Sequence, residues 1–288
     1  RRTAAVSSAL VQALADTSAA VRLRALDALK GQADPGLFEP LEQWARTAHA
    51  AHAHGASMQG RKIGTWGEMA IFSFQASKVM PTVEGGMGMY RTREYFERAA
   101  AFGHYEDPAK FPADSPIRAY EGTGFGQKYR MHPFAAAVAR QQLRGLEARN
   151  ALVAKNVRAM NDRLAQLPGI AEPRCRPDQT RVYYHANLLF LDFAKLGFSR
   201  EALVKALKAE GVRVSFWDYP EQHKLKIYSE AKWWHHPPTI PASMPGNAHV
   251  NANHIFVPVS YEEAPELIDQ YVQAFEKVWA NRGKLVSA

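Results

Sequence analysis

The sequence has one cysteine, no long apolar run and no block of basic residues. Cys175 stands alone among 288 residues, which excludes an internal disulfide framework and favours a reducing compartment. No uninterrupted apolar stretch approaches the roughly 18 residues that a membrane helix needs, and Gln12 and Asp16 interrupt the opening segment too early for a signal peptide. We therefore expect a cytoplasmic protein that does not contact a membrane. The first residue is not methionine, so we also expect a fragment or a trimmed chain.

The basic residues are scattered along the chain. The net charge is +8 and the pI is about 9.5, which raises the question of a nucleic-acid partner. No run of four or more lysines and arginines occurs, however, and the basic segments mix charged with apolar positions. This pattern favours a basic protein that meets anionic small molecules over one that binds nucleic acid. We predict no nucleic-acid partner and no metal site.

Residues 1–46 differ from the rest of the chain in composition and in the spacing of their apolar residues. They are rich in alanine, and a set of apolar residues recurs at helical spacing: Leu10, Leu14, Val21, Ala25, Leu26 and Leu29. The segment resembles a single HEAT-type repeat, which cannot bury its apolar face alone. An amphipathic helical hairpin that packs on the following domain explains the pattern equally well, and both interpretations stay open.

From residue 47 onward strands and helices alternate, which predicts an α/β architecture. Apolar runs predict strands at 69–74, 85–92, 183–193, 212–216 and 254–259. Helical patterns occupy 93–103, 132–167, 199–211 and 264–282, and a loop rich in proline and tryptophan runs to about Asn247. We expect three parts: a short all-α segment (1–46), a larger domain that includes the long bridging helix (47–167) and a small C-terminal α/β domain (168–288).

One short segment, AIFSFQASKVMPTVEGGMGMY (70–90), places a single lysine between a buried strand and a glycine-rich turn. A rigid scaffold can hold an amine at that position. Schiff-base chemistry needs such a lysine, partly desolvated so that the neutral amine is populated. Taken alone the pattern is weak, because most lysines after strands are solvated loop residues.

The wider context of Lys78 resembles the active-site segment of the DegT/StrS family of pyridoxal 5′-phosphate (PLP) sugar aminotransferases. The chain has HAHGA, GRKIG and FSF in the family's order, Lys78 follows Ser73 by five residues, and Glu-Gly-Gly at 84–86 begins six residues after Lys78. The similarity covers about residues 49–288. It implies a fold type I, PLP-dependent transferase-like architecture, with a partial large domain at 47–167 and a small C-terminal α/β domain.

The resemblance assigns roles to five residues. Lys78 would form the Schiff base with PLP and later move a proton, and Ser73 would donate its hydroxyl to the PLP phosphate. His52 matches the position beside the phenolic oxygen of the ring, although an ordinary loop histidine explains it as well. Lys128 stands where the family often has an asparagine that reaches the cofactor phosphate of the partner subunit, which implies a homodimer with shared sites. Arg130 is a candidate for substrate binding, and an intramolecular salt bridge is the alternative that we favour.

Two departures from the family pattern stand out. The aspartate that keeps the pyridine nitrogen protonated is replaced by His49, and no aspartate or glutamate lies between Glu42 and Glu68. A neutral imidazole stabilises a pyridinium far less than a carboxylate does, and an imidazolium would oppose it. The family's N-terminal part, which holds the phosphate-binding loop at a helix N-terminus, is also not represented in residues 1–46.

The resemblance implies an enzyme that transfers an amino group from glutamate or glutamine to a keto sugar, usually nucleotide-linked, or to a keto-cyclitol. Such reactions belong to polysaccharide or antibiotic biosynthesis. The alternative is a catalytically impaired descendant that acts as a binding or assembly module. The departures at His49 and in the N-terminal part favour this alternative, whereas the retained Ser73 and Lys78 oppose it.

Overall fold

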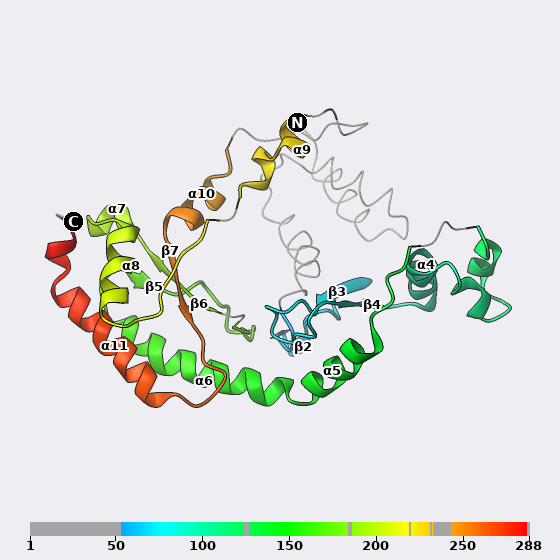
Figure 1. Ribbon diagram of the computed structural model, residues 1–288, viewed down its shortest axis with the longest axis horizontal. Helices are drawn as coiled ribbons and strands as arrows, with labels where there is room; N and C mark the ends of the chain where they lie inside the picture. The colour runs from blue at the N-terminus through cyan, green and yellow to red at the C-terminus, as the bar shows by residue number, and fades with distance from the viewer. Residues whose placement is uncertain are drawn as a thin grey trace, which may run out of the picture. The chain divides into compact units, whose positions relative to one another are not determined.

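The computed structural model describes residues 53–123, 127–183, 186–218, 220–230, 232 and 243–286. The chain divides into two compact units (Figure 1). The first unit contains the described residues up to Arg144 together with Asp178–Thr180, and the second contains Gly145–Pro177 and the chain from Arg181 onward. The segments 1–46, His49 and His52, which the sequence analysis singled out, lie outside the described residues.

An antiparallel hairpin of two five-residue strands is central to the first unit. Strand β3 (Met69–Ser73) pairs with β4 (Gly86–Tyr90). A smaller hairpin, β1 (Ser57–Met58) with β2 (Arg61–Lys62), precedes it. The loop 178–180 joins the first unit, because the Thr180 hydroxyl accepts a 2.7 Å hydrogen bond from the backbone N–H of Ser57.

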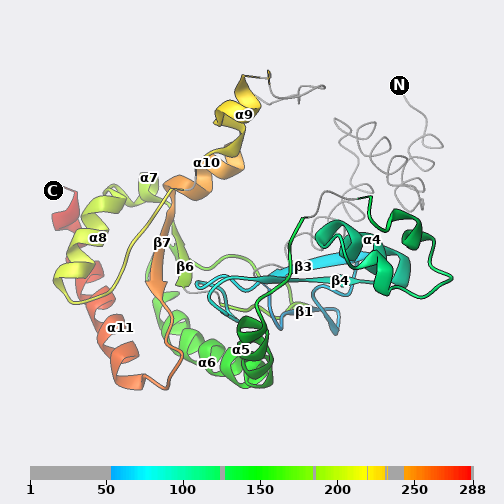
Figure 2. The same cartoon turned by 45° about the vertical axis from the view of Figure 1, so that its right-hand side comes forward.

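Helical segments follow the hairpin (Figures 1 and 2). They are α4 (Arg93–Gly103), the 3₁₀ helices η2 (Pro108–Lys110) and η3 (Pro116–Tyr120), and α5 (Pro133–Arg144). Thr92 caps α4, since its hydroxyl accepts from the Tyr95 N–H at 3.3 Å, as short polar residues do at helix starts.

The second unit is a three-stranded antiparallel sheet covered by helices. The strand order is β5 (Ile170–Ala171), β6 (Ala186–Leu191) and β7 (His254–Pro258). The longer helices are α6 (Leu146–Leu164), α8 (Arg200–Ala209) and α11 (Pro265–Ala280). In both views α6 and α11 run alongside one another. Apolar residues of these helices and strands form one core that includes Leu164, Leu189, Leu203 and Phe275.

Shorter helices complete the second unit. They are α7 (Phe193–Leu196), η4 (Gln222–Lys224), α9 (Lys226–Ser229), α10 (Pro245–Ala252) and η5 (Arg282–Leu285). The segment that was predicted as a loop up to Asn247 therefore contains helical turns, and this prediction was wrong for α9 and for the start of α10.

Two further predictions of local structure were wrong. The single long helix predicted over 132–167 is broken at Gly145, which lies between α5 and α6 with φ −94° and ψ 0°. The strand predicted at 212–216 is reduced to one antiparallel bridge between Ser215 and Phe256. The backbone N–H of Val212 donates to the Leu207 carbonyl and that of Val214 to the Val212 carbonyl, so neither pairs with a neighbouring strand. The boundary between the two units falls at Gly145, inside the segment that the sequence analysis assigned to the large domain.

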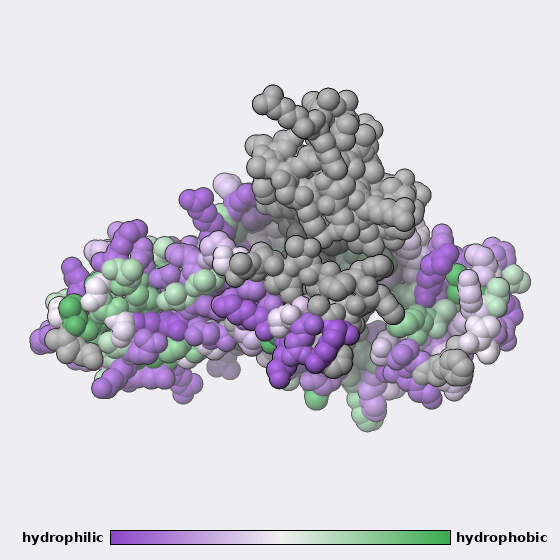
Figure 3. All heavy atoms as spheres, turned by 90° about the horizontal axis from the view of Figure 1, so that it is seen from above, coloured by the Kyte–Doolittle hydropathy of each residue, from purple (hydrophilic) through white to green (hydrophobic). Residues whose placement is uncertain are grey.

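Within the described residues no helix is long and apolar enough to span a membrane. In the same part of the chain no group of three or more histidine, cysteine, aspartate or glutamate residues is arranged to hold a metal ion. Figure 3 shows hydrophobic residues interspersed with hydrophilic ones over the face that it presents, which is ordinary for a protein surface.

Candidate functional site

A groove with a cavity volume of about 720 Å³ lies in the first unit. One side is the β3–β4 hairpin, and the other is α4, with Tyr129 and Arg130 also lining it. The strand register places Ser73 opposite Gly86 and Ile71 opposite Gly88. Paired residues of adjacent strands point to the same face, so the β4 side of this face has no side chain opposite Ser73 or Ile71.

Gly86 and Gly88 have close neighbours at the position where a larger residue would place its Cβ. A Cβ at Gly86 would lie 3.0 Å from the carbonyl oxygen of Phe72, and a Cβ at Gly88 would lie 2.3 Å from the Tyr90 hydroxyl. The second contact shows that the Tyr90 ring lies across Gly88. Residues larger than glycine at positions 86 and 88 of GGMGMY would therefore crowd the Phe72 carbonyl and the Tyr90 ring.

The loop that joins β3 to β4 carries Lys78. It is closed at its base by Phe74, whose N–H donates to the Gly85 carbonyl and whose carbonyl accepts from the Thr82 N–H, each at 2.8 Å. Gly85 has a φ of +150°, a value that glycine adopts readily and other residues rarely do. The Lys78 N–H donates to the Gln75 carbonyl at 2.9 Å, and Lys78 is half-buried. The lysine is therefore held in a defined turn.

His104 lies at one end of the groove and was not singled out from the sequence. Its side chain is only 2% exposed, and its Nδ1 accepts a 3.3 Å hydrogen bond from the Glu106 N–H. A neutral imidazole that accepts at Nδ1 carries its proton on Nε2. Within the described residues Nε2 has no hydrogen-bond partner, and the Glu106 carboxylate is 3.9 Å away. No spacing in the sequence marks this residue, because its burial depends on the turn that follows α4.

The structure brings together only some of the predicted site residues. Ser73 and Arg130 both line the groove, whereas Lys78 and Lys128 are not among its lining residues. The Lys128 ammonium lies 5.4 Å from the centroid of the Tyr105 ring. Among the described residues no carboxylate forms an ion pair with Arg130, so the salt bridge that we favoured for it is not found there.

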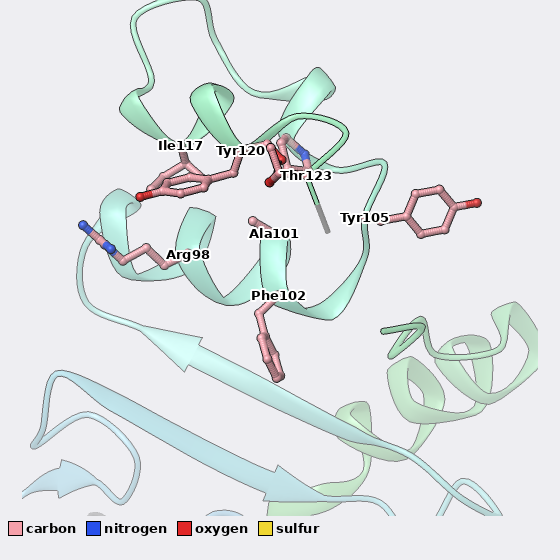
Figure 4. A pocket seen from close by; sticks show the side chains of 8 residues that line it. Arg98, Ala101, Phe102, Tyr105, Ile117, Tyr120 and Thr123 are labelled. Atoms are coloured by element: carbon pink, nitrogen blue, oxygen red, sulfur yellow. The ribbon is translucent and has the colours of Figure 1, made fainter. Parts of the chain in front are cut away.

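A second, smaller cavity of about 240 Å³ lies between α4 and the 3₁₀ helices. In Figure 4 Ile117 and Tyr120 lie over α4 near Arg98, while Tyr105 points away from them. Apart from Arg98 and Thr123, most of its lining is aromatic or aliphatic. Among the described residues its lining includes no lysine, histidine, cysteine or carboxylate, so it is the weaker candidate for a catalytic site.

A polar cluster in the second unit has carboxyl and phenol groups with shifted pKa values. Burial alone would raise the pKa of Glu172, but hydrogen bonds from Arg158, at 2.5 Å, and from Asn161 hold that pKa below its ordinary value. Burial raises the pKa of the neighbouring Tyr183 phenol. Asn161 also exchanges hydrogen bonds with Asn187 on β6. The cluster ties α6 to β6 and is explained by packing.

Solved aminotransferases share the fold of this chain. The aminotransferase TlmJ from Streptoalloteichus hindustanus superposes with a TM-score of 0.61 at 22% identity, over 81% of this chain and 58% of its own. The aminotransferase from Psychrobacter cryohalolentis gives a TM-score of 0.67 at 23% identity, over 81% and 61% of the two chains. The fold is thus that of the fold type I, PLP-dependent aminotransferases, and the predicted fold class is confirmed.

The particular family follows from the sequence match. Residues 47–276 match the DegT/DnrJ/EryC1/StrS aminotransferase family, and the chain belongs to it. The L-glutamine:2-deoxy-scyllo-inosose aminotransferase of Streptoalloteichus tenebrarius is 34% identical over 213 residues, which are 72% of this chain and 48% of that protein. The chain therefore spans about half the length of this curated relative. The predicted family membership is confirmed.

Aminotransferases of this family depend on PLP. The described residues fit its phosphate end, because the Ser73 hydroxyl and the Arg130 guanidinium line one groove, and both are donors that an anionic phosphate needs. Lys78, which the sequence analysis predicted to bind the aldehyde carbon of the cofactor, lies on the loop of the same hairpin but does not line the groove. The two residues predicted near the ring, His49 and His52, lie outside the described part of the chain.

Proposed function

We propose that the chain is the catalytic-lysine portion of a PLP-dependent aminotransferase that converts a keto-cyclitol or a keto sugar to the amine, with glutamine or glutamate as donor. The observation that carries this proposal is the Ser73, Lys78 and 84–86 spacing on one hairpin. The 34% identical relative acts on 2-deoxy-scyllo-inosose with L-glutamine, which favours a cyclitol and glutamine over the alternatives.

Each residue of the proposed site has a role in binding the cofactor or in moving a proton. When bound, PLP supplies an electron sink for the carbon that loses its proton. Lys78 holds the cofactor and then, as a free amine, carries that proton. Ser73 donates a hydrogen bond to the phosphate, and Arg130 adds a positive charge beside it. Gly86 leaves the β4 backbone without a side chain opposite Ser73, whereas the Tyr90 ring covers Gly88.

The proposed homodimer and the proposed location in the cell each rest on a single residue. Lys128 is proposed to reach the cofactor phosphate of a partner subunit in a homodimer, as a point charge without the directed donors of an amide. The lysine is exposed, as a residue that reaches a second subunit must be. We also propose a cytoplasmic location, because the single cysteine favours a reducing compartment.

The test is covalent capture of PLP. The purified chain is incubated with PLP, reduced with borohydride and digested, and the modified lysine is identified by mass spectrometry. We expect the adduct on Lys78 and its loss in Lys78→Ala, while Lys205→Ala, an exposed α8 lysine, keeps it. Adduct formation that is unchanged in Lys78→Ala would contradict the assignment. Amino transfer from glutamine to 2-deoxy-scyllo-inosose is then measured on the same samples.

A non-catalytic descendant is the second candidate. The observation in its favour is that Lys78 does not line the groove that contains Ser73 and Arg130. A chain that folds, binds no PLP and forms no adduct would support this candidate. Adduct formation without amino transfer would indicate an impaired enzyme.

A further inference from the structure

A third cavity, of about 190 Å³, lies within the second unit. It is formed by residues of α6, of α11 and of the segment that leaves β7, and the two helices run alongside one another (Figure 1). The described residues that line it belong to this unit alone, so it is separate from the groove of the first unit. Its volume is roughly that of six water molecules in the liquid, which is enough for a small organic molecule.

Most of the lining of this cavity is apolar. Four of the side chains come from the two helices: Val157, Met160, Leu267 and Ile268. Asn156, which is 6% exposed, fixes the loop that forms another wall, because its amide donates to the carbonyls of Ser260 at 3.2 Å and of Glu262 at 2.7 Å. A largely apolar cavity with a few polar groups is typical of sites for organic ligands, and it favours a ligand with a hydrocarbon part over a bare inorganic ion.

Tyr271 places a buried hydroxyl in the same cavity. The residue is 7% exposed, and its phenolic oxygen accepts a 3.2 Å hydrogen bond from the backbone N–H of Arg213. A phenol also has one proton to donate, and within the described residues no acceptor for that proton is present. A buried donor without an acceptor is costly, so this hydroxyl would gain a hydrogen bond from a ligand.

Arg213 gives the cavity its charge. Among the described residues of the lining it is the one charged side chain, and it is exposed. Glu263, on the loop that Asn156 fixes, forms its ion pair with Lys155 at 2.9 Å and so does not neutralise Arg213. A positive charge and a hydroxyl donor beside apolar walls favour a ligand that has an anionic end and a hydrocarbon end.

We propose that this cavity binds a small aliphatic monocarboxylate. The carboxylate accepts hydrogen bonds from the Arg213 guanidinium and the Tyr271 hydroxyl, as charge-assisted bonds of this kind are strong. The hydrocarbon chain lies against the side chains of α6 and α11 and is removed from water. The site goes beyond the proposed amino transfer, because it uses none of the residues assigned to PLP. A ligand that binds only the folded state stabilises it, so the acid should raise the thermal midpoint of the second unit.

The test measures binding of a defined acid to the full chain without PLP. Isothermal titration calorimetry uses 4-methylpentanoate as the probe. The matched amide, 4-methylpentanamide, tests the need for the charge, and acetate tests the need for the hydrocarbon chain. We expect saturable binding of the acid to one site per chain. Binding of the amide and of acetate should each be weaker by about tenfold or more, since the first loses the charge-assisted bonds and the second loses several buried carbon atoms.

Two variants assign the site. Arg213→Gln should weaken binding of 4-methylpentanoate about tenfold or more, and Tyr271→Phe about fivefold, because phenylalanine keeps the ring and loses the hydroxyl. Arg174→Gln, at an exposed arginine of the same unit, removes the same charge elsewhere and should leave binding unchanged. Far-UV circular dichroism of each variant separates lost binding from lost folding.

Three outcomes would overturn the proposal. The chain could give no saturable heat with the acid, as a cavity that holds only water would. The amide could bind as tightly as the acid, or Arg213→Gln could bind the acid as well as Arg174→Gln does. The measurement needs no PLP and changes no residue of the groove, so its result and that of the covalent-capture test are independent.

Discussion

At the scale of single residues, Glu97 is a buried carboxylate that accepts hydrogen bonds from two side chains. It lies on α4 and is 4% exposed. It accepts hydrogen bonds from the Ser115 hydroxyl at 2.5 Å and from Arg93 Nε at 2.6 Å. The Ser115 bond first, and then the Arg93 bond, hold the pKa of Glu97 below its ordinary value. Ser115 also caps η3, since its hydroxyl accepts from the Ile117 N–H at 3.2 Å, so one carboxylate joins two elements.

This arrangement makes the first unit sensitive to acid. A lowered pKa in the folded state means that the stabilisation is present above the unfolded-state pKa and is lost as the pH falls through the folded-state value. We expect the thermal midpoint to drop on acidification below the ordinary glutamate value of about 4.5. Glu97→Gln should be less stable at neutral pH and should lose part of this acid dependence. Differential scanning calorimetry between neutral and acidic pH measures both effects.

The control for Glu97 is Glu94→Gln, which removes an exposed ion pair with Arg98 on the same helix. Exposed pairs contribute little, so this variant should keep the acid dependence of the unaltered chain. An acid response in Glu97→Gln equal to that of the unaltered chain would contradict the assignment.

Sequence and structure agree unevenly for the residues of the site. Ser73, Lys78 and 84–86 could be predicted as site residues because a fixed spacing along one hairpin is visible in a single sequence, and the structure places Ser73 but not Lys78 in the groove. His104 and Glu97 could not, because each is defined by groups that lie elsewhere in the chain or in a following turn. Arg130 was predicted as a site residue. That it forms no ion pair with a described carboxylate depends on the position of the 127–130 segment, which no local sequence pattern predicts.

At the scale of elements, Arg200 connects three parts of the second unit. Its side chain is 10% exposed, and its two terminal nitrogens donate to the two carboxylate oxygens of Asp218 at 3.1 and 3.2 Å. The guanidinium lies 3.9 Å from the centroid of the Phe216 ring and also donates to the Asn251 carbonyl. The planar, bidentate and stacked geometry is one that arginine satisfies and lysine does not.

Arg200→Lys should therefore destabilise the second unit by about 1.5–3 kcal/mol, which is the range for hydrogen bonds to a charged group. Urea unfolding followed by tryptophan fluorescence measures the change. Arg174→Lys, at an exposed residue of the same unit, should change the unfolding free energy by less than about 0.5 kcal/mol. Equal effects of the two substitutions would show that the bidentate geometry contributes nothing.

The break between α5 and α6 offers a second test at this scale. Gly145 has a negative φ of −94°, and a Cβ there would meet no atom within 4 Å. Gly145→Ala is expected to stabilise the chain by about 0.4–1 kcal/mol, since alanine reduces the entropy of the unfolded chain. Gly211→Ala is the contrast, because Gly211 has a φ of +90° and alanine would be strained there. Thermal unfolding should move in opposite directions for the two variants.

The helix break could not be predicted from periodicity, since an isolated glycine within a helical pattern is usually tolerated. The strand predicted at 212–216 failed for a related reason. Its alternating valines are buried as expected for a strand, but their N–H groups bond locally. Apolar alternation reports which side chains are inside and does not report which backbone groups are paired. Helices α8 and α11 were predicted correctly because amphipathicity and length agreed; Ser199 caps α8, and Pro265 stands at the start of α11.

At the scale of the whole molecule, the boundary between the two units depends on which helices contribute residues to the core of the second unit. The apolar cluster of the second unit draws Met160 and Leu164 from α6 and Phe275 from α11. Val153 and Val157 of α6 are also buried. The boundary predicted from sequence, between 167 and 168, would remove this entire helix from the domain that packs against it.

We therefore expect a fragment of residues 145–288 to fold by itself and a fragment of residues 168–288 not to. The longer fragment retains every residue of the core cluster, whereas the shorter one exposes the α6-facing side of α11. Cooperative thermal unfolding and near-ultraviolet circular dichroism of Trp279 should be seen in the longer fragment alone. Phe275→Ala within it should cost about 3–5 kcal/mol, as for other fully buried aromatic residues. Cooperative unfolding of the 168–288 fragment would instead place the boundary where the sequence predicted it and make α6 a dispensable bridge.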